Sequence, residues 1–170
     1  MHFSIQWIII ITTVEQNGGK GHSLNTKVEE MKTRMKGEYL HSIDAKGRLF
    51  IPAKFREKLG FGFVLTKGLE NTLTIYPEAE WEKFTEKISS LPTKQSLTLR
   101  RFFVASACDC APDVQGRVLI PQVLRDYAEL DRNVVVIGMG DHIEIWDEAR
   151  WKALDLTSDN VESIMEAAGI

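Results

Sequence analysis

Asp44-Ala-Lys-Gly-Arg48-Leu-Phe-Ile-Pro52 returns 69 residues later as Asp113-Val-Gln-Gly-Arg117-Val-Leu-Ile-Pro121. Further along the chain the spacing becomes 70, so that Trp81 falls on Trp151. A single Asp-x-x-Gly-Arg motif is weak evidence, but two copies followed by matching residues indicate an internal repeat. The chain is therefore predicted to contain two tandem copies of one small unit.

Each motif has the residues of a tight turn that leads into a strand. Asp44 stands at the first position of a four-residue turn and Gly47 at the last, the placement favoured in type I turns, and Asp113 and Gly116 repeat it. Arg48 should then leave the turn at a fixed angle. We expect the Asp44 carboxylate to accept a hydrogen bond from the Arg48 guanidinium.

The elements around the first motif alternate between short strands and short helices. We expect a strand over 38–43, a second strand over 49–51, and a helix that begins at Pro52 and ends before Gly60. A hairpin should follow over 63–66 and 73–76, and the second copy repeats it over 134–137 and 142–146.

A helix with an apolar stripe is predicted after the first hairpin. The stripe repeats at helical spacing and is interpreted as core; it contains Trp81, Phe84, Ile88 and Leu91. In the second copy Trp151 and Leu154 begin the same pattern. A further helix, over 97–104, is expected to join the two copies.

A single copy of about 50 residues has exposed strand edges and a small core, so it is expected to be unstable alone. We therefore predict an α+β fold in which two tandem, pseudo-symmetric, β-rich units with short helices interlock in one body, with both turns on one side. The expected boundaries are 1–34 for an N-terminal extension, 35–92 for the first repeat, 93–108 for a connecting helix and strand, 109–156 for the second repeat and 157–170 for a C-terminal tail.

The first 34 residues differ in character from the repeats. The run from Ile8 to Ile11 has no Lys or Arg before it and no small-x-small cleavage site after it, which argues against a signal peptide. The run is also far shorter than the roughly 20 apolar residues of a transmembrane helix. We expect a disordered extension, or translated sequence upstream of a start at Met31 or Met35, and no membrane association.

The charges are divided unevenly along the chain. Residues 35–100 carry 11 Lys and Arg against 8 Asp and Glu, whereas residues 101–170 carry 6 against 13. One half is thus suited to face a polyanion, and the other would be repelled by it.

The residue types needed for catalysis or metal binding do not converge. His41 and His142 belong to no metal-ligand spacing, and the segment 18–21, Gly-Gly-Lys-Gly, lacks the flanking elements of a phosphate loop. The two cysteines, Cys108 and Cys110, are predicted to point to opposite faces of a strand, with Cys108 as a small core residue in a reducing cytosol. We expect no enzymatic activity, metal, cofactor or small-molecule substrate.

The tandem motifs, each followed by a short helix, a hairpin and a Trp-containing helix, resemble the MraZ family. Members of this family are bacterial regulators of the division and cell-wall gene cluster, and their halves are similar to SpoVT-AbrB DNA-binding units. The resemblance covers residues 35 to about 156. It implies a cytoplasmic, nucleoid-associated protein that forms a closed homo-oligomeric ring and binds tandem promoter repeats in double-stranded DNA as a repressor, without a cofactor.

Lys and Arg near the motif are candidate DNA contacts, because duplex DNA presents phosphates and Arg also matches the guanine edge. We predict that Lys46 and Arg48 dominate and that Arg117 is weaker or lies at a subunit contact, with added charge from Lys54 and Arg56. The second copy has Gln115 and Val123 where the first has Lys46 and Lys54, so the shared residues are interpreted as architectural: Asp44, Gly47, Asp113 and Gly116.

Two alternatives stay open. The Asp44 and Arg48 pair has a purely structural interpretation as a local ion pair within a turn. The whole chain has an alternative as a non-enzymatic, oligomeric protein-interaction scaffold, in which the turns form subunit contacts.

Overall fold

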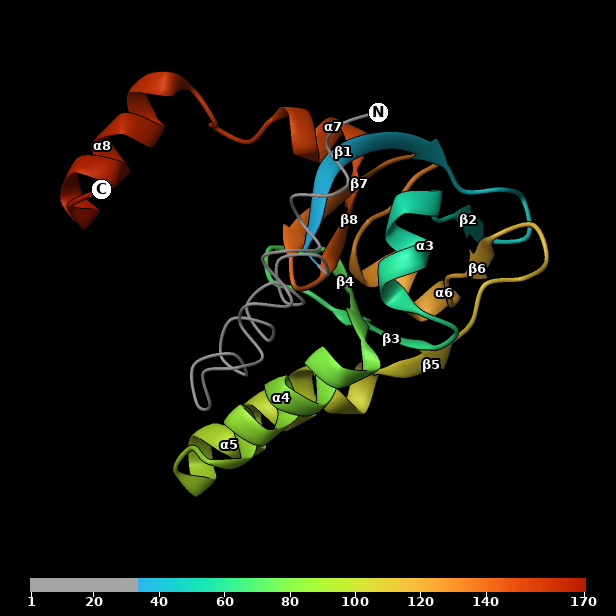
Figure 1. Cartoon of the computed structure of the whole chain (residues 1–170), viewed down its shortest axis with the longest axis horizontal. Helices are drawn as coiled ribbons and strands as arrows, with labels where there is room; N and C mark the ends of the chain where they lie inside the picture. Colours follow the sequence, from blue (N-terminus) through green and yellow to red (C-terminus); the bar gives the residue numbers. More distant parts are fainter. Residues whose placement is uncertain (1–33) are drawn as a thin grey trace, which may run out of the picture. The chain divides into compact units, whose positions relative to one another are not determined.

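The same order of elements occurs twice along residues 34–170, the part of the chain that the computed structural model describes (Figure 1). The expected N-terminal extension lies outside the described residues, Arg34 excepted. The first copy and its connecting segment contain β1 (Met35–Ser42), β2 (Arg48–Phe50), α3 (Ala53–Leu59), β3 (Phe63–Lys67), β4 (Leu73–Pro77), α4 (Glu78–Ser89), α5 (Thr93–Phe102), a 3-10 turn (Val104–Ser106) and β5 (Cys108–Cys110). The second copy contains β6 (Arg117–Leu119), α6 (Gln122–Tyr127), β7 (Asn133–Gly140), β8 (Ile143–Asp147), α7 (Glu148–Lys152) and α8 (Ser158–Ala168).

The two copies exchange strands. One antiparallel sheet has the order β1-β7-β8-β4-β3-β5, and a separate two-stranded ribbon pairs β2 with β6. The first copy's β1 pairs with β7 of the second along its whole length, and β5, just before the second motif, pairs with β3 of the first. Each copy thereby covers an edge of the other. The predicted α+β fold of two interlocked units is confirmed.

Equivalent residues face each other where the copies meet. In the ribbon Leu49 pairs with Val118, and in the sheet Thr74 of β4 pairs with Glu144 of β8. Each pair joins the same position of the two repeats, so an approximate twofold axis relates the copies. The axis brings both turns to one side of the fold, as predicted.

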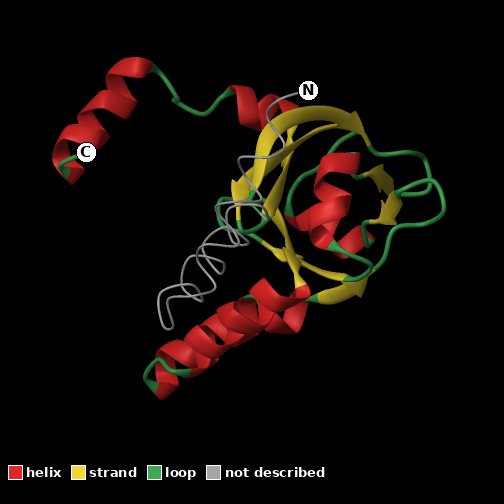
Figure 2. Ribbon diagram, viewed as in Figure 1, coloured by secondary structure: helices red, strands yellow, loops and turns green. Residues whose placement is uncertain are grey.

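The core lies between the curved sheet and the ribbon, with α3 and α6 on the concave side of the sheet (Figure 2). Helix α3 begins after Pro52, whose φ of −51° suits a helix start, and it buries Phe55 and Leu59 one turn apart. In α6 the buried residue is Leu124. Core residues at these helices and on the inner face of the ribbon are 0 to 3% exposed.

The outer face of the sheet is covered unevenly. Phe103 packs edge-on against Phe84 of α4, and Trp151 of α7 packs against Trp146. The interpretation of the α4 stripe as core is confirmed for Ile88 alone: Trp81 and Phe84 are half-buried, and Leu91 is exposed.

The exposure of this stripe follows from the geometry of α4. The helix runs beyond the sheet and lies beside α5 in a helical hairpin (Figure 1). The connecting helix also begins earlier than predicted, at Thr93 rather than at residue 97, because Pro92 sets the start. Within residues 34–170 no helix combines the length and the apolar character needed to cross a membrane.

The prediction that the two cysteines point to opposite faces of a strand is wrong. Cys108 and Cys110 are two residues apart in β5, and residues at this spacing lie on the same face of a strand. Their sulfur atoms are 3.8 Å apart, and both side chains pack against the edge of the core. Both are free thiols in the structure.

Candidate nucleic-acid interface

The first turn is closed by its own side chain as well as by its backbone. The Gly47 amide donates to the Asp44 carbonyl at 2.8 Å, as a four-residue turn requires. Oδ1 of Asp44 accepts from the backbone amides of Lys46 at 2.9 Å and Arg48 at 3.0 Å. Oδ2 accepts from Nε of Arg48 at 2.8 Å and lies 2.7 Å from Nη2. The predicted hydrogen bond between carboxylate and guanidinium is present.

The second turn has the same network. The Gly116 amide donates to the Asp113 carbonyl at 2.8 Å, and Oδ1 of Asp113 accepts from the amides of Gln115 and Arg117 at 2.9 Å. Oδ2 accepts from Nε and Nη2 of Arg117 at 2.9 and 2.7 Å. Nη1 of Arg117 is also 4.0 Å from Oδ2 of Asp44 in the first turn. The two arginines therefore belong to one adjoining pair of turns.

The ribbon gives these arginines a common surface. Arg48 pairs with Leu119 and Phe50 with Arg117, and alternation along each strand places these four side chains on the face opposite to buried Leu49. Phe50 is 37% exposed and Leu119 is 58% exposed. The outer face of the ribbon thus presents two fixed guanidinium groups with an apolar residue beside each.

Hydrogen bonding fixes the charge state of both turns. The side-chain hydrogen bond from Arg48, reinforced by its backbone amide, lowers the pKa of Asp44 from 3.8 to about 2. The same donors of Arg117 lower the pKa of Asp113 to about 2. Both carboxylates are therefore ionised at neutral pH, and each holds its arginine by a charge-assisted bond.

Each turn is supported by the other copy. The Ile120 amide donates to the Gly47 carbonyl at 2.9 Å, and the Ile51 amide donates to the Gly116 carbonyl at 3.0 Å. A Cβ atom at Gly116 would lie 2.8 Å from the Arg56 guanidinium carbon. Because glycine leaves this space free, an arginine from the helix of one copy lies against the turn of the other.

The equivalent contact forms at the first turn. A Cβ atom at Gly47 would overlap the Arg125 guanidinium, which hydrogen-bonds the Ile120 carbonyl and the Gln122 side chain. Gly47 has a φ of +78°, a region that favours glycine. Sequence matching pairs Arg56 with Arg125, but their contacts with the opposite turn depend on the way the copies interlock.

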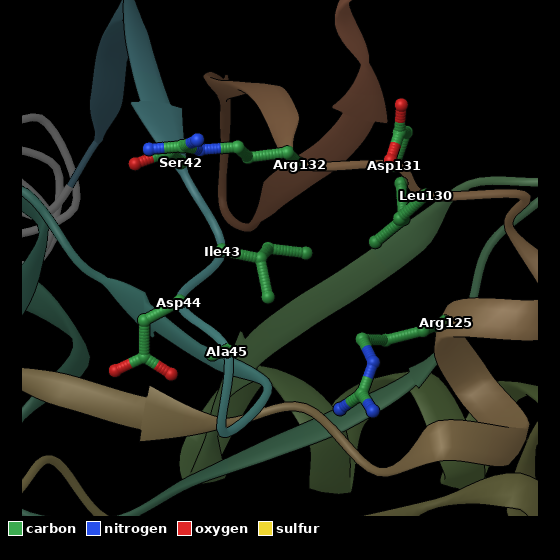
Figure 3. Close-up of a pocket in the computed structure, with 8 residues that line it drawn as sticks. All are labelled: Ser42, Ile43, Asp44, Ala45, Arg125, Leu130, Asp131 and Arg132. Atoms are coloured by element: carbon green, nitrogen blue, oxygen red, sulfur yellow. The ribbon is translucent and has the colours of Figure 1, made fainter.

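A cavity of about 580 Å³ lies beside the first turn. Figure 3 shows Ile43 and Arg125 directed toward each other across it, while the Asp44 carboxylate turns away from them. Two arginines and two aspartates are among the residues that line it: Arg125, Arg132, Asp44 and Asp131. The mixed charge makes it a poor match for one strongly charged small ligand.

The predicted basic residues have different surroundings. Lys46 and Lys54 are exposed, and Lys46 lies in the turn beside the ribbon. Arg48 and Arg117 are partly exposed, with 29% and 26% of their side-chain surface accessible. Arg56 is held within the fold: its Nε donates to the Ile51 carbonyl at 3.0 Å, and its guanidinium lies over the Phe50 ring. Its part in DNA contact stays a prediction.

Two members of this surface were missed in the sequence. Phe50 and Leu119 lie on the outer face because they are two residues from Arg48 and Arg117 in their strands. This alternation could have predicted both residues from the sequence.

Residues 34–170 contain no group of three or more metal-ligating side chains.

Comparison with known proteins gives consistent matches. The family model described as "MraZ protein, putative antitoxin-like" matches residues 35–101 and 103–168. The transcriptional regulator MraZ of Halothermothrix orenii is 48% identical over 140 residues, which cover 79% of this chain and 98% of that protein. The transcriptional regulator MraZ of Carboxydothermus hydrogenoformans is 50% identical over 117 residues, 68% of this chain and 82% of that protein.

Proposed function

The chain belongs to the MraZ family, and we propose on this premise that it is a sequence-specific DNA-binding transcription regulator without enzymatic activity. The observation that carries the proposal is the pair of fixed guanidinium groups of Arg48 and Arg117 on one exposed ribbon. A two-stranded ribbon fits the major groove of B-DNA, where arginine pairs with O6 and N7 of guanine.

The aspartates contribute by positioning the arginines. In each turn the carboxylate occupies Nε and Nη2. Nη1 of Arg48 is thereby left to donate outward, whereas Nη1 of Arg117 lies 4.0 Å from Oδ2 of Asp44 in the first turn. A guanidinium held this way loses less side-chain entropy when it meets a base. Asp44 and Asp113 thus have an architectural role in the proposal, and Lys46 adds a contact to phosphate.

The two copies are proposed to contribute unequally. Gln115 and Val123 replace Lys46 and Lys54 in the second copy, which carries a net charge of −7 over residues 101–170. Binding by the first copy alone is expected to be weak. In a closed ring, several such faces engage tandem promoter repeats together, and avidity supplies the affinity. We propose this ring as the form that represses the chain's own gene cluster at the nucleoid.

A salt titration of binding tests the site. DNA from upstream of the chain's own gene is titrated by mobility shift with the full chain, Arg48→Ala, Arg117→Ala and Lys46→Gln, and with Lys87→Gln on α4 as a control. Loss of a base-reading arginine is expected to weaken binding about 5- to 150-fold at each engaged site, corresponding to roughly 1–3 kcal/mol, and to relax sequence preference.

Lys46→Gln is expected to act differently from the arginine variants. It should weaken binding to every sequence alike and reduce the slope of log affinity against log salt by about 1 per engaged site. Unchanged affinity and slope in Arg48→Ala and Lys46→Gln would refute the site. No binding by the parent chain at any salt concentration would favour the protein-interaction scaffold.

A further inference from the structure

Cys108 and Cys110 form a pair of thiols on β5 that the proposed DNA-binding surface does not use. They alternate with the exposed Asp109, which lies on the opposite face of the strand, and both are half-buried against the edge of the core. Thiols on opposite faces, as predicted from the sequence, could not share one ligand. On the same face they can.

The distance between the two sulfur atoms is that of two ligands on one metal ion. Their separation of 3.8 Å is far longer than the disulfide bond of about 2.05 Å. Two thiolates that each lie about 2.3 Å from a tetrahedral Zn²⁺ ion are about 3.8 Å apart, because the angle between them at the ion is about 109°. A tetrahedral ion therefore fits with both sulfur atoms where they are, whereas a disulfide would draw them together.

The strand holds the pair at this spacing. Both cysteines lie in the ladder to β3, where Cys108 pairs with Leu65 and Cys110 pairs with Phe63. Cα atoms two residues apart in a strand are separated by about 6.6–6.8 Å, and disulfides are found up to about 6.8 Å. The backbone thus presents the two thiols side by side and does not favour a covalent bond between them.

Hydrogen bonding prepares one of the thiols to lose its proton. The bond that Cys108 accepts from the Cys110 thiol lowers the pKa of Cys108 to about 7, and the same bond raises the pKa of Cys110. Thiolate is the form in which cysteine binds metals. The other polar contacts are long: Sγ of Cys108 lies 3.6 Å from the Leu65 carbonyl oxygen, and Sγ of Cys110 lies 3.6 Å from the Cys108 carbonyl oxygen. A bound ion would replace only weak hydrogen bonds.

An ion can approach the thiols from the end of the sheet. In the part of the chain that the structure describes, β5 is the last strand of its sheet and pairs with β3 alone (Figure 1). No third His, Cys, Asp or Glu of residues 34–170 joins the pair as a ligand. Two positions of a tetrahedral ion are therefore left to water or to small thiols.

We propose that Cys108 and Cys110 form a binding site for a thiophilic, tetrahedral metal ion of the Zn²⁺ class, completed by water or small thiols. On binding, the protons that the thiols still hold pass to solvent and each sulfur forms one bond to the ion, with no change in oxidation state. The ion links the first and last residues of β5. It should therefore stabilise the strand that leads to Asp113 and the second turn.

Cobalt titration tests the site on the full chain, fully reduced and without air. Co²⁺ is the coloured substitute for Zn²⁺, and its bonds to thiolate absorb in the near ultraviolet. We expect one Co²⁺ ion per chain to bind with this absorption and Zn²⁺ to displace it. Because the second thiolate binds intramolecularly, Cys108→Ser and Cys110→Ser should each weaken binding by about 100-fold. Asp109→Asn, on the opposite face, is the matched control and should bind like the parent.

Protection of the thiols gives a measurement that needs no substitution. Cys108 and Cys110 are the only cysteines in the sequence, so alkylation by iodoacetamide reports on this pair, and Zn²⁺ should slow it. The arrangement of the two thiols belongs to the folded strand. Zn²⁺ should therefore raise the Tm of the parent chain, and it should not raise the Tm of either variant with a single cysteine.

Three outcomes overturn the proposal. They are a parent chain without thiolate-to-cobalt absorption, a variant with both cysteines replaced by serine that binds Co²⁺ as tightly as the parent, and a parent chain whose Tm and alkylation rate do not respond to Zn²⁺. The double variant keeps all four histidines of the sequence, so binding that it retains lies elsewhere. None of these measurements uses DNA, so a failure of the metal site leaves the proposed DNA-binding function untouched.

Discussion

Replacing Gly47 with alanine tests whether the first turn is held by the second copy. The substitution places a side chain at a φ of +78°, which costs about 1–2 kcal/mol in the left-handed region. The new methyl also displaces the Arg125 guanidinium, which gives up its hydrogen bond to the Ile120 carbonyl for a further ~1 kcal/mol. We expect the free energy of unfolding to fall by about 2–3 kcal/mol.

A double-mutant cycle isolates the contact between copies. In an Arg125→Ala background the guanidinium is already absent, so Gly47→Ala should cost only the backbone part, about 1–2 kcal/mol. Both are measured by urea unfolding with tryptophan fluorescence at one protein concentration. Gly62→Ala is the control, because its Cβ meets nothing within 4 Å, and it should be nearly neutral. An equal cost of Gly47→Ala in both backgrounds would refute the proposed support.

Three further predictions concern stability. The pKa values of Asp44 and Asp113 are about 2 in the fold and near 3.9 in an unfolded chain, so the two carboxylates add to the free energy of unfolding above pH 4, and this addition is lost as the pH falls toward 2. A variant with both aspartates replaced by asparagine should not show this loss when its unfolding is followed during acid titration. A pH profile equal to that of the parent chain would count against the turn networks. Leu49 has 0% exposure, so Leu49→Ala should lower the free energy of unfolding, measured in urea, by about 2–5 kcal/mol. Leu119→Ala, on the outer face of the ribbon, should lower it by less than about 0.5 kcal/mol. Equal losses would mean that the ribbon faces are wrongly assigned. Tyr127→Phe removes a 2.8 Å hydrogen bond to a backbone carbonyl in the loop between β3 and β4, and the Tm should fall by an amount equivalent to about 1 kcal/mol; no change would show that water replaces the bond.

The sequence alone determined the features that depend on neighbours a few residues away. The Asp-x-x-Gly-Arg turn closes by hydrogen bonds between residues two to four apart, so its residues predict its geometry in both copies. The start of α3 directly after Pro52 and the strands of the hairpins are equally local, and the repeat itself is visible as matching residues.

Only the tertiary structure decided which copy supports which turn. Arg56 and Arg125 look like surface charges in the sequence, yet each lies against a glycine of the opposite copy because β1 and β5 cross between the units. The exposure of Leu91 likewise depends on how far α4 extends beyond the sheet. The strand pairings between the copies join residues 43 to 105 positions apart, and their free energy comes from burying surfaces that exist only once both copies are folded.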